Sequence, residues 1–276
     1  MSKRTMVITG ASDGIGAAAA RELSRRGDRV VLVGRSATKT RRVADELGAD
    51  FFVADFADLA DVRGLAATLL DRYPRIDVLA NNAGGIMGER QTTVDGNEKT
   101  FQVNHLAPFL LTNLLMDRLR DSRATVINTS SVANSLLGNI VIGDLNATSG
   151  YSANKAYGDA KLANILFTSE LHRRFHEQGI STAAFHPGGV ATGFATGSTS
   201  VMRLVYGTWL KRFLKTPEQG ADTLIWLATT KPGVDWVSGE YYDRRRVAKT
   251  NKQAADPALA RELWDRSLDL VAARAV

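Results

Sequence analysis

The chain contains no cysteine among its 276 residues. This absence excludes a disulfide scaffold, a cysteine nucleophile and a metal site built from thiolates. The start of the chain also lacks a long apolar run, since the run at residues 5–9 is far shorter than the roughly 20 residues of a membrane span. It is too short for the apolar part of a signal peptide as well. We therefore expect a cytoplasmic protein with no integral membrane segment.

Proline is scarce, with six residues against 24 glycines, and the glycines gather at the ends of apolar runs. They form no repeat, which argues against collagen, low-complexity and solenoid proteins. The charge excess is small, because 35 Lys+Arg against 29 Asp+Glu give a net charge of +6. The basic cluster of the chain consists of Arg244, Arg245, Arg246, Lys249 and Lys252. No aromatic side chains alternate with these charges, so we interpret the cluster as a solvated face and expect no nucleic-acid partner.

Short apolar runs alternate with longer segments of helical period along most of the chain. The apolar runs are residues 6–9, 30–33, 51–54, 76–80, 124–128 and 182–185. The helical segments between them are residues 15–26, 38–47, 59–73, 98–119 and 157–176. Unbroken apolar runs of this length are typical of strands buried on both faces of a parallel sheet. The alternation predicts an α/β fold with a doubly wound parallel sheet, whose ligand crevice lies at the carboxyl ends of the strands.

The last third of the chain is less regular. We expect a mobile lid at about residues 190–216, a helix at 218–230, a short strand near 240–242 and an amphipathic helix at 257–271. No linker divides the sequence, so we predict a single domain over residues 1–276.

A glycine-rich turn follows the first predicted strand and leads into the first predicted helix. In this turn Gly10 permits a tight bend, Gly14 lets phosphate approach the backbone and Gly16 lets the helix pack closely on the strand. The free amides and the dipole of the helix start would then hold a pyrophosphate. The turn also contains Ser12, Asp13 and Ile15. An ordinary loop is the alternative, but the position between strand and helix favours a dinucleotide-binding (Rossmann) domain.

The end of the second predicted strand indicates which dinucleotide is bound. NAD-binding proteins place a carboxylate there, whereas this chain has Arg35, which would accommodate the 2′-phosphate of NADP. The alternative is a solvated surface arginine. Asp55 follows the third strand, where it could bond the adenine edge or, alternatively, cap the next helix.

The motifs occur in the order and approximate spacing of the short-chain dehydrogenase/reductase family, which the chain resembles over nearly its whole length. They are the turn at residues 9–16, Asn81-Asn82-Ala83-Gly84, Asn104, Ser131, the pair Tyr157 and Lys161, and Pro187-Gly188. Residues 101–106, 161–164, 186–188, 239–242 and 263–264 further resemble the retinol-dehydrogenase-like branch, which includes WW-domain oxidoreductases and protochlorophyllide reductases.

The resemblance implies a hydride transfer between nicotinamide and a carbonyl carbon, with an acid that protonates the alkoxide. Tyrosine, with an ordinary pKa of about 10, needs a nearby cation for this role. Lys161 follows Tyr157 by four residues and therefore lies on the same face of a helix. Ser131 would bond the substrate oxygen where charge develops. Asn104, by resemblance, completes the tetrad by holding the central helix and a water that contacts the lysine.

Two of these assignments have competitors in the sequence. Tyr151 and Lys155 form a second pair of the same spacing, but the family-like continuation at residues 161–164 favours Tyr157, and Tyr151 becomes a residue of the helix entry. Ser130 competes with Ser131, although adjacent side chains of a strand point to opposite faces. The long interval between Ser131 and Tyr157 predicts an inserted loop at residues 134–150.

The resemblance also assigns roles at the nicotinamide and adenosine ends. Asn82, Ala83 and Gly84 would shape the backbone beside the adenosine, although a plain strand-end turn is an alternative. Pro187, Gly188 and Thr192 would contact the nicotinamide carboxamide and phosphate and leave the pro-S face open. His172 and His176 lie four residues apart as metal ligands can, but no third ligand accompanies them, so we expect no metal.

The apolar residues of the predicted lid would cover a lipophilic ketone, aldehyde or alcohol. Basic residues at 203, 211, 212 and 215 interleave with them, so a packed helix or a membrane-surface helix is the alternative. The leading hypothesis is an NADP-dependent oxidoreductase acting on such a small molecule. The alternatives are a non-catalytic dinucleotide sensor or scaffold and a reductase of carbon-carbon double bonds. By resemblance we expect a homodimer or homotetramer, formed through the helices that precede and contain Tyr157.

Overall fold

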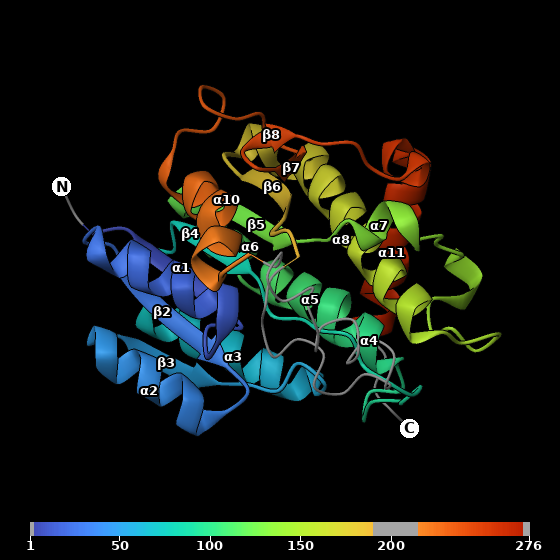
Figure 1. The fold of residues 1–276 in the computed structure, drawn as a ribbon, viewed down its shortest axis with the longest axis horizontal. Helices are drawn as coiled ribbons and strands as arrows, with labels where there is room; N and C mark the ends of the chain where they lie inside the picture. The colour runs from blue at the N-terminus through green and yellow to red at the C-terminus, as the bar shows by residue number, and fades with distance from the viewer. Residues whose placement is uncertain (1–2, 190–214, 273–276) are drawn as a thin grey trace.

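A computed structural model describes residues 3–189 and 215–272. Its centre is an eight-stranded sheet in the order β3-β2-β1-β4-β5-β6-β7-β8 (Figure 1). The strands are β1 (Thr5–Thr9), β2 (Arg29–Gly34), β3 (Asp50–Val53), β4 (Val78–Asn81), β5 (Thr125–Thr129), β6 (Ser181–His186), β7 (Tyr241–Asp243) and β8 (Arg246–Val247). Strands β1 to β7 pair in parallel, and β8 pairs antiparallel to β7. The predicted doubly wound parallel sheet is thus confirmed, with strand order reversing between β1 and β4.

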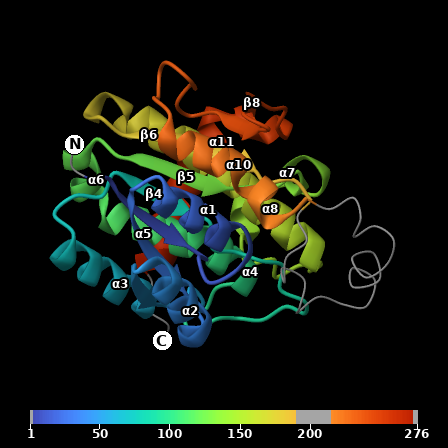
Figure 2. The same cartoon turned by 60° about the vertical axis from the view of Figure 1, so that its left-hand side comes forward.

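Helices cover both faces of the sheet, and each face has its own apolar core. The helices are α1 (Gly14–Arg25), α2 (Ala37–Leu47), α3 (Leu59–Arg72), α4 (Lys99–Phe101), α5 (Ala107–Leu114), α6 (Met116–Ser122), α7 (Ala133–Leu136), α8 (Ala153–Phe175), α10 (Pro217–Thr229) and α11 (Pro257–Ala272). Figures 1 and 2 show α1 and α10 side by side over one face of the sheet. Helix α11 contributes to the core of the opposite face. Along β1, Met6 and Ile8 enter the core under α1 and α10, while Val7 enters the core under α3, α5, α8 and α11. This two-sided burial explains why the strands read as unbroken apolar runs.

The helices that follow the first three strands begin at capping residues. Asp13, Ser36 and Asp58 precede α1, α2 and α3, and each side chain accepts a hydrogen bond from an amide of its first turn. Such caps satisfy amides that have no partner inside the helix. The caps therefore fix the helix starts at the carboxyl edge of the sheet, where the ligand crevice was predicted.

The predicted helical segment at residues 98–119 is helical almost throughout, but it is not one regular α-helix. The chain instead forms α4, a π-helical turn η1 (Gln102–Leu106), α5 and α6, with a break at Leu115. The predicted helix at 157–176 begins earlier, at Ala153, and the inserted loop at 134–150 contains most of α7 and a 3-10 turn at Ile142–Asp144. The predicted lid at 190–216 lies almost entirely outside the described residues.

Helix α11 packs on α8 and α5, the helices through which we expected self-association. The ring of Trp264 lies 5.0 Å from that of Phe109 on α5 and 5.7 Å from that of Phe167 on α8, measured between ring centroids. An interface through these faces would require α11 to move away. None of the helices in the described part of the chain combines the length and the apolar character that a membrane span requires.

Candidate active site

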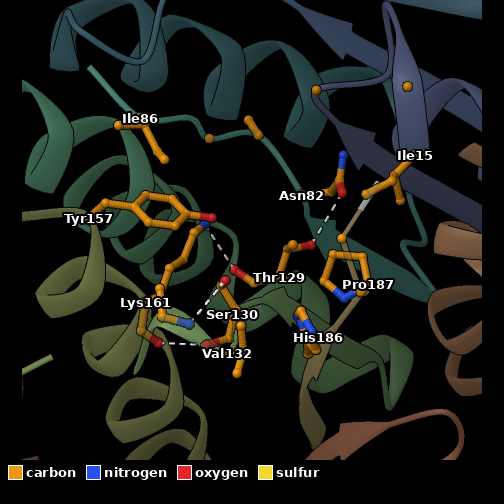
Figure 3. A pocket seen from close by; sticks show the side chains of 18 of the residues that line it. Ile15, Asn82, Ile86, Thr129, Ser130, Val132, Tyr157, Lys161, His186 and Pro187 are labelled. Carbon is orange, nitrogen blue, oxygen red and sulfur yellow. Dashed lines mark hydrogen bonds between the residues drawn. The ribbon is translucent and has the colours of Figure 1, made fainter. Parts of the chain in front are cut away.

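A cavity of about 600 Å³ opens at the carboxyl ends of the parallel strands (Figure 3). Fourteen of the predicted site residues line it: Gly10, Ser12, Asp13, Gly14, Ile15, Arg35, Asn82, Ala83, Gly84, Ser131, Tyr157, Lys161, Pro187 and Gly188. Gly16, Asp55 and Asn104 are not among its lining residues. Thr192 lies outside the described residues.

The glycine-rich turn packs too tightly for side chains at two positions. Gly10 has a φ of 66°, and a Cβ atom there would lie 2.8 Å from the Cα of Ala83. A Cβ atom on Gly16 would lie 2.3 Å from the carbonyl oxygen of Gly10. Gly16 therefore acts by letting α1 approach the strand, as predicted, without itself reaching the cavity. Within α1 the first turn carries no acidic side chain, and the carboxylate at this helix end is that of the N-cap Asp13, whose side chain accepts from the amide of Gly14.

Thr9 at the end of β1 fixes the backbone after β4. Its Oγ1 accepts hydrogen bonds from the amides of Asn82 and Ala83, both at 3.0 Å, and donates to the carbonyl of Ala80 at 3.2 Å. The Asn82 side chain donates to the Thr9 carbonyl at 3.1 Å and accepts from the Thr129 hydroxyl at 3.2 Å. These bonds join β1, β4 and β5 at the cavity.

Two cations, Arg35 and Lys39, line the cavity where β2 leads into α2. Lys39 Nζ lies 3.5 Å from Asp13 Oδ2, so the lysine also meets the glycine-rich turn. Lys39, in the first turn of α2, was not predicted as a site residue. Arg35 and Lys39 therefore place two cationic side chains at this end of the cavity.

Tyr157 and Lys161 project from α8 into the same part of the cavity (Figure 3). Lys161 is only 1% exposed, and its Nζ donates to the carbonyl of Thr129 at 3.1 Å. The Nζ atom lies 5.4 Å from the centroid of the Tyr157 ring. Burial lowers the pKa of Lys161 to about 7, because desolvation disfavours the charged ammonium. The tyrosine ring packs against Ile86 and Ala133.

Ser131 and Ser130 have different surroundings. The buried Ser130 hydroxyl donates to the carbonyl of Lys161 at 2.7 Å, so it ties the end of β5 to α8. Ser131 Oγ accepts from the amide of Ala133 at 3.2 Å, which leaves its own hydrogen able to donate. Both residues line the cavity, but these bonds favour Ser131 as a donor to a ligand.

The competing pair Tyr151 and Lys155 makes its hydrogen bonds outside the cavity. The Tyr151 hydroxyl donates to the carbonyl of Gly88 at 3.2 Å, and Lys155 Nζ donates to the carbonyl of Asn139 at 3.0 Å. Neither residue lines the cavity. This geometry favours Tyr157 and Lys161 as the chemical pair.

Asn104 lies in the π-helical turn and is fully buried. Its Nδ2 donates to the carbonyls of Gly85 and Thr100, both at 2.8 Å, while its Oδ1 accepts from the Gly85 amide at 3.1 Å. The side chain thus fastens the turn to the segment after β4. Single π-helical turns inside α-helices often occur at functional sites.

A sequence profile of the family described as short chain dehydrogenase matches residues 4–202. The chain belongs to the short-chain dehydrogenase/reductase family. It is therefore an oxidoreductase of this family, as the resemblance of its motifs predicted.

Named relatives of this short-chain dehydrogenase/reductase align over almost its whole length. It is 45% identical to a candidate daunorubicin C-13 ketoreductase, DnrU, of Streptomyces sp. (strain C5), over 96% of this chain and 91% of that protein. It is 40% identical to human retinol dehydrogenase 11, over 97% and 86% of the two chains. A crystal structure of an uncharacterized protein from Mycobacterium paratuberculosis has a TM-score of 0.78 at 34% identity and covers 100% and 96%. Pseudomonas aeruginosa RhlG, solved with NADP in its active site, has a TM-score of 0.68 at 27% identity and covers 87% and 94%.

The wall of the cavity beside Tyr157 is apolar in this dehydrogenase/reductase. Ile86, Val132, Ala133, Leu136 and Leu137 line it. Leu136 is 72% exposed, although large apolar side chains are usually buried. Apolar contacts were predicted only from the lid, so this contribution from α7 and its neighbours was not predicted.

His186 at the end of β6 is a second lining residue that the sequence analysis did not assign. Its buried Nδ1 has no hydrogen-bond partner among the described residues. Burial lowers the pKa of this imidazole, while the carboxylate of Asp243 acts in the opposite direction. A neutral imidazole therefore faces the end of the cavity formed by Pro187 and Gly188.

Two predictions fall outside the cavity. The Asp55 side chain accepts from the amide of Ala57 at 3.0 Å, and Asp58 rather than Asp55 caps α3, so the alternative reading of Asp55 as the cap is wrong. His172 bonds Ser238 Oγ through Nδ1 at 2.9 Å, and its ring stacks on His176. Across the described ranges, acidic residues, histidines and cysteines form no group that could hold a metal ion.

Proposed function

We propose that this oxidoreductase uses NADP(H) and transfers a hydride between nicotinamide and a lipophilic carbonyl or alcohol, with Tyr157 as proton donor and acceptor. The observation that carries the proposal is the buried ammonium of Lys161 beside the Tyr157 ring, in a cavity that continues to an apolar wall. The names of the related ketoreductase and retinol dehydrogenase support this substrate class.

The residues present fit an NADP molecule. A Cβ atom at Gly10 would collide with Ala83, so the turn keeps its backbone bare toward the cavity. The start of α1 would hold the pyrophosphate, while Arg35 and Lys39 would pair with the 2′-phosphate. Asn82, Gly84, Pro187 and Gly188 would hold the adenosine and nicotinamide ends. The bound nicotinamide supplies or accepts the hydride.

In carbonyl reduction, the Tyr157 hydroxyl gives its proton to the oxygen that becomes the alcohol. The phenolate that remains is stabilised by the Lys161 ammonium, and the ammonium in turn gains a charged partner inside a buried site. Ser131 donates its hydroxyl hydrogen to the same substrate oxygen as charge develops. Asn104 contributes by fixing the segment at Gly85 that adjoins Gly84. Alcohol oxidation reverses these steps, with the phenolate accepting the proton.

The Tyr157→Phe variant tests this mechanism. We expect a loss of turnover of at least about 1,000-fold, because the variant lacks the proton donor and acceptor. NADPH binding should change little, because the ring is kept. The measurement is NADPH oxidation at the absorbance of the reduced nicotinamide, with a panel of lipophilic aldehydes, ketones and quinones, beside a direct NADPH titration.

The matched control is Tyr151→Phe, which removes a hydroxyl outside the cavity. Retained turnover in Tyr157→Phe would contradict the assignment of the proton donor. Wild-type binding of NADPH without turnover of any panel member would favour the dinucleotide sensor. Reduction restricted to activated carbon-carbon double bonds would favour the third hypothesis.

A homodimer or homotetramer and a cytoplasmic location stay predictions. Because Trp264 of α11 covers parts of α5 and α8, a homo-oligomer would need another surface or a displaced α11. Light scattering of the purified chain tests the first prediction, and fractionation of the native host tests the second.

A further inference from the structure

A row of buried polar side chains leads from α11 to the candidate active site. Ser267 of α11, His105 of the π-helical turn and Asn164 of α8 are all at most 4% exposed. His105 Nε2 lies 3.0 Å from Ser267 Oγ, and His105 Nδ1 lies 3.3 Å from Asn164 Oδ1. None of the three lines the cavity, and none has a role in the proposed proton transfer.

The far end of this row reaches the carbonyl that holds Lys161. Asn164 Nδ2 donates to the carbonyl of Asn104 at 3.0 Å and to that of Thr129 at 3.1 Å. Lys161 Nζ donates to the same Thr129 oxygen, also at 3.1 Å. One carbonyl oxygen therefore accepts from both the asparagine amide and the lysine ammonium.

The hydrogen-bond partners fix the direction of every bond in the row. The carbonyls of Asn104 and Thr129 can only accept, so the NH₂ group of Asn164 faces them and its oxygen faces His105. His105 must then carry its proton on Nδ1, and its Nε2 accepts from the hydroxyl of Ser267. Burial lowers the pKa of His105 to about 4, so the ring stays neutral near pH 7 and keeps this arrangement.

From this arrangement we propose that Asn164 is a positioning residue, which fixes the Thr129 carbonyl against Lys161 while His105 and Ser267 hold its amide in the required orientation. The inference rests on the proposed function, because it gives Lys161 a role in proton transfer. Asn164 connects three parts of the site, since Thr129 ends β5, Asn104 lies in the π-helical turn and Asn164 itself lies on α8.

The Asn164→Ala variant tests the proposal. Without the amide, the Thr129 carbonyl and the ammonium lose their fixed geometry, and water can enter beside Lys161. Turnover should fall by about tenfold to a hundredfold. The acidic limb of the pH profile for alcohol oxidation should move up by about one pH unit, since a displaced ammonium stabilises the phenolate less. The Michaelis constant for NADPH should change less than about threefold.

Thr168→Ala is the matched control on the same helix. Thr168 is fully buried and accepts from Asn128 Nδ2 at 2.9 Å, so its loss also opens space and removes a buried hydrogen bond. It does not line the cavity, and its hydroxyl donates to the backbone carbonyl of Asn164 at 2.7 Å but makes no bond to the Asn164 amide, to Lys161 or to the Thr129 carbonyl. Thr168→Ala should lower the stability of the protein and leave the pH profile of alcohol oxidation unchanged. An equal shift in both variants would show general loosening and would overturn the proposal.

The titration of Lys161 itself provides a second readout. The other titratable side chains that line the cavity are Asp13, Arg35, Lys39, Tyr157 and His186. NMR of ¹³C-labelled lysine in the cofactor-free protein, with the Lys161 signal assigned from Lys161→Met, reports the pKa directly. Asn164→Ala should raise that pKa because the ammonium gains hydration. Ser267→Ala should raise it by a smaller amount, because His105 Nε2 then loses its hydrogen-bond donor and the ring is held less firmly against Asn164.

These readouts separate the two hypotheses. If the wild type turns over no substrate, the proposed function fails, but the lysine titration still tests the positioning role. An unchanged Lys161 titration in Asn164→Ala overturns that role whatever the activity. If Asn164→Ala does not fold, Ser267→Ala decides, and an unchanged titration in that variant overturns the proposal.

Discussion

Replacing Lys161 by methionine should change how stability depends on pH. Lys161 is 1% exposed, and burial lowers its pKa from 10.5 to about 7. Each pKa unit corresponds to about 1.4 kcal/mol, so the fully protonated lysine costs the folded state about 5 kcal/mol. Because the folded pKa lies below the unfolded one, the folded state binds fewer protons between pH 7 and 10.5. The lysine therefore makes the wild type more stable as pH rises through this window.

Lys161→Met removes this contribution while keeping a side chain of similar length. Lys161→Met should be more stable than the wild type at low pH. The difference between the two free energies of unfolding should be about 3 kcal/mol larger at pH 6 than at pH 9. This difference between two pH values is independent of how well methionine packs. The assay is urea unfolding of the cofactor-free proteins at several pH values, with extrapolation to zero urea.

The exposed Lys249 provides the control for the loss of one lysine, in the variant Lys249→Met. A stability difference between Lys161→Met and wild type that stays constant within about 1 kcal/mol from pH 6 to pH 9 would refute the reasoning. It would mean that the ammonium is solvated or paired in the folded state. The Lys161 ammonium could then do little to stabilise the Tyr157 phenolate.

Two further predictions concern the ends of the cavity. Arg35→Ala should weaken NADPH binding by about tenfold to a hundredfold and leave NADH binding unchanged, since a charge-assisted bond to phosphate is lost. Arg42→Ala, at an exposed position of α2, is the control in the titration. Equal effects on both dinucleotides would contradict NADP selection by Arg35. Leu136→Ser should raise the KM of a long-chain aldehyde by about tenfold and spare a short polar one. The control is Leu268→Ser on α11, and an unchanged KM would exclude α7 from the substrate site.

The sequence predicted the sheet well because its strands are buried on both faces. The run at residues 30–33 corresponds to β2 (Arg29–Gly34), and the run at 182–185 to β6 (Ser181–His186). The helical segment at 98–119 was also predicted, but the π-helical turn inside it was not. The Asn104 side chain in the π-helical turn bonds the carbonyl of Gly85, on a segment that no helical period of residues 98–119 could reveal.

The glycine-rich turn and the pair Tyr157 and Lys161 could be singled out in the sequence because each forms a local pattern. The glycine-rich turn is contiguous, and Tyr157 and Lys161 are one helical turn apart. Lys39 has no such pattern, because Arg35 precedes the N-cap of α2 and Lys39 lies inside the helix. His186 could not be predicted either, because its significance depends on the burial of its Nδ1 atom at the cavity.

The residues that support Lys161 have no local signature at all. His105 and Ser267 are 162 positions apart, and Asn164 lies 59 positions from His105. Each alone resembles a satisfied polar residue of the core. They become informative only when their bonds are followed to the Thr129 carbonyl, where the positions of the donors decide how the ammonium is held. A helix that closes the chain, α11, is thereby connected to a lysine on α8. Substitutions at the far end of that connection should therefore alter the proton chemistry without touching the cavity.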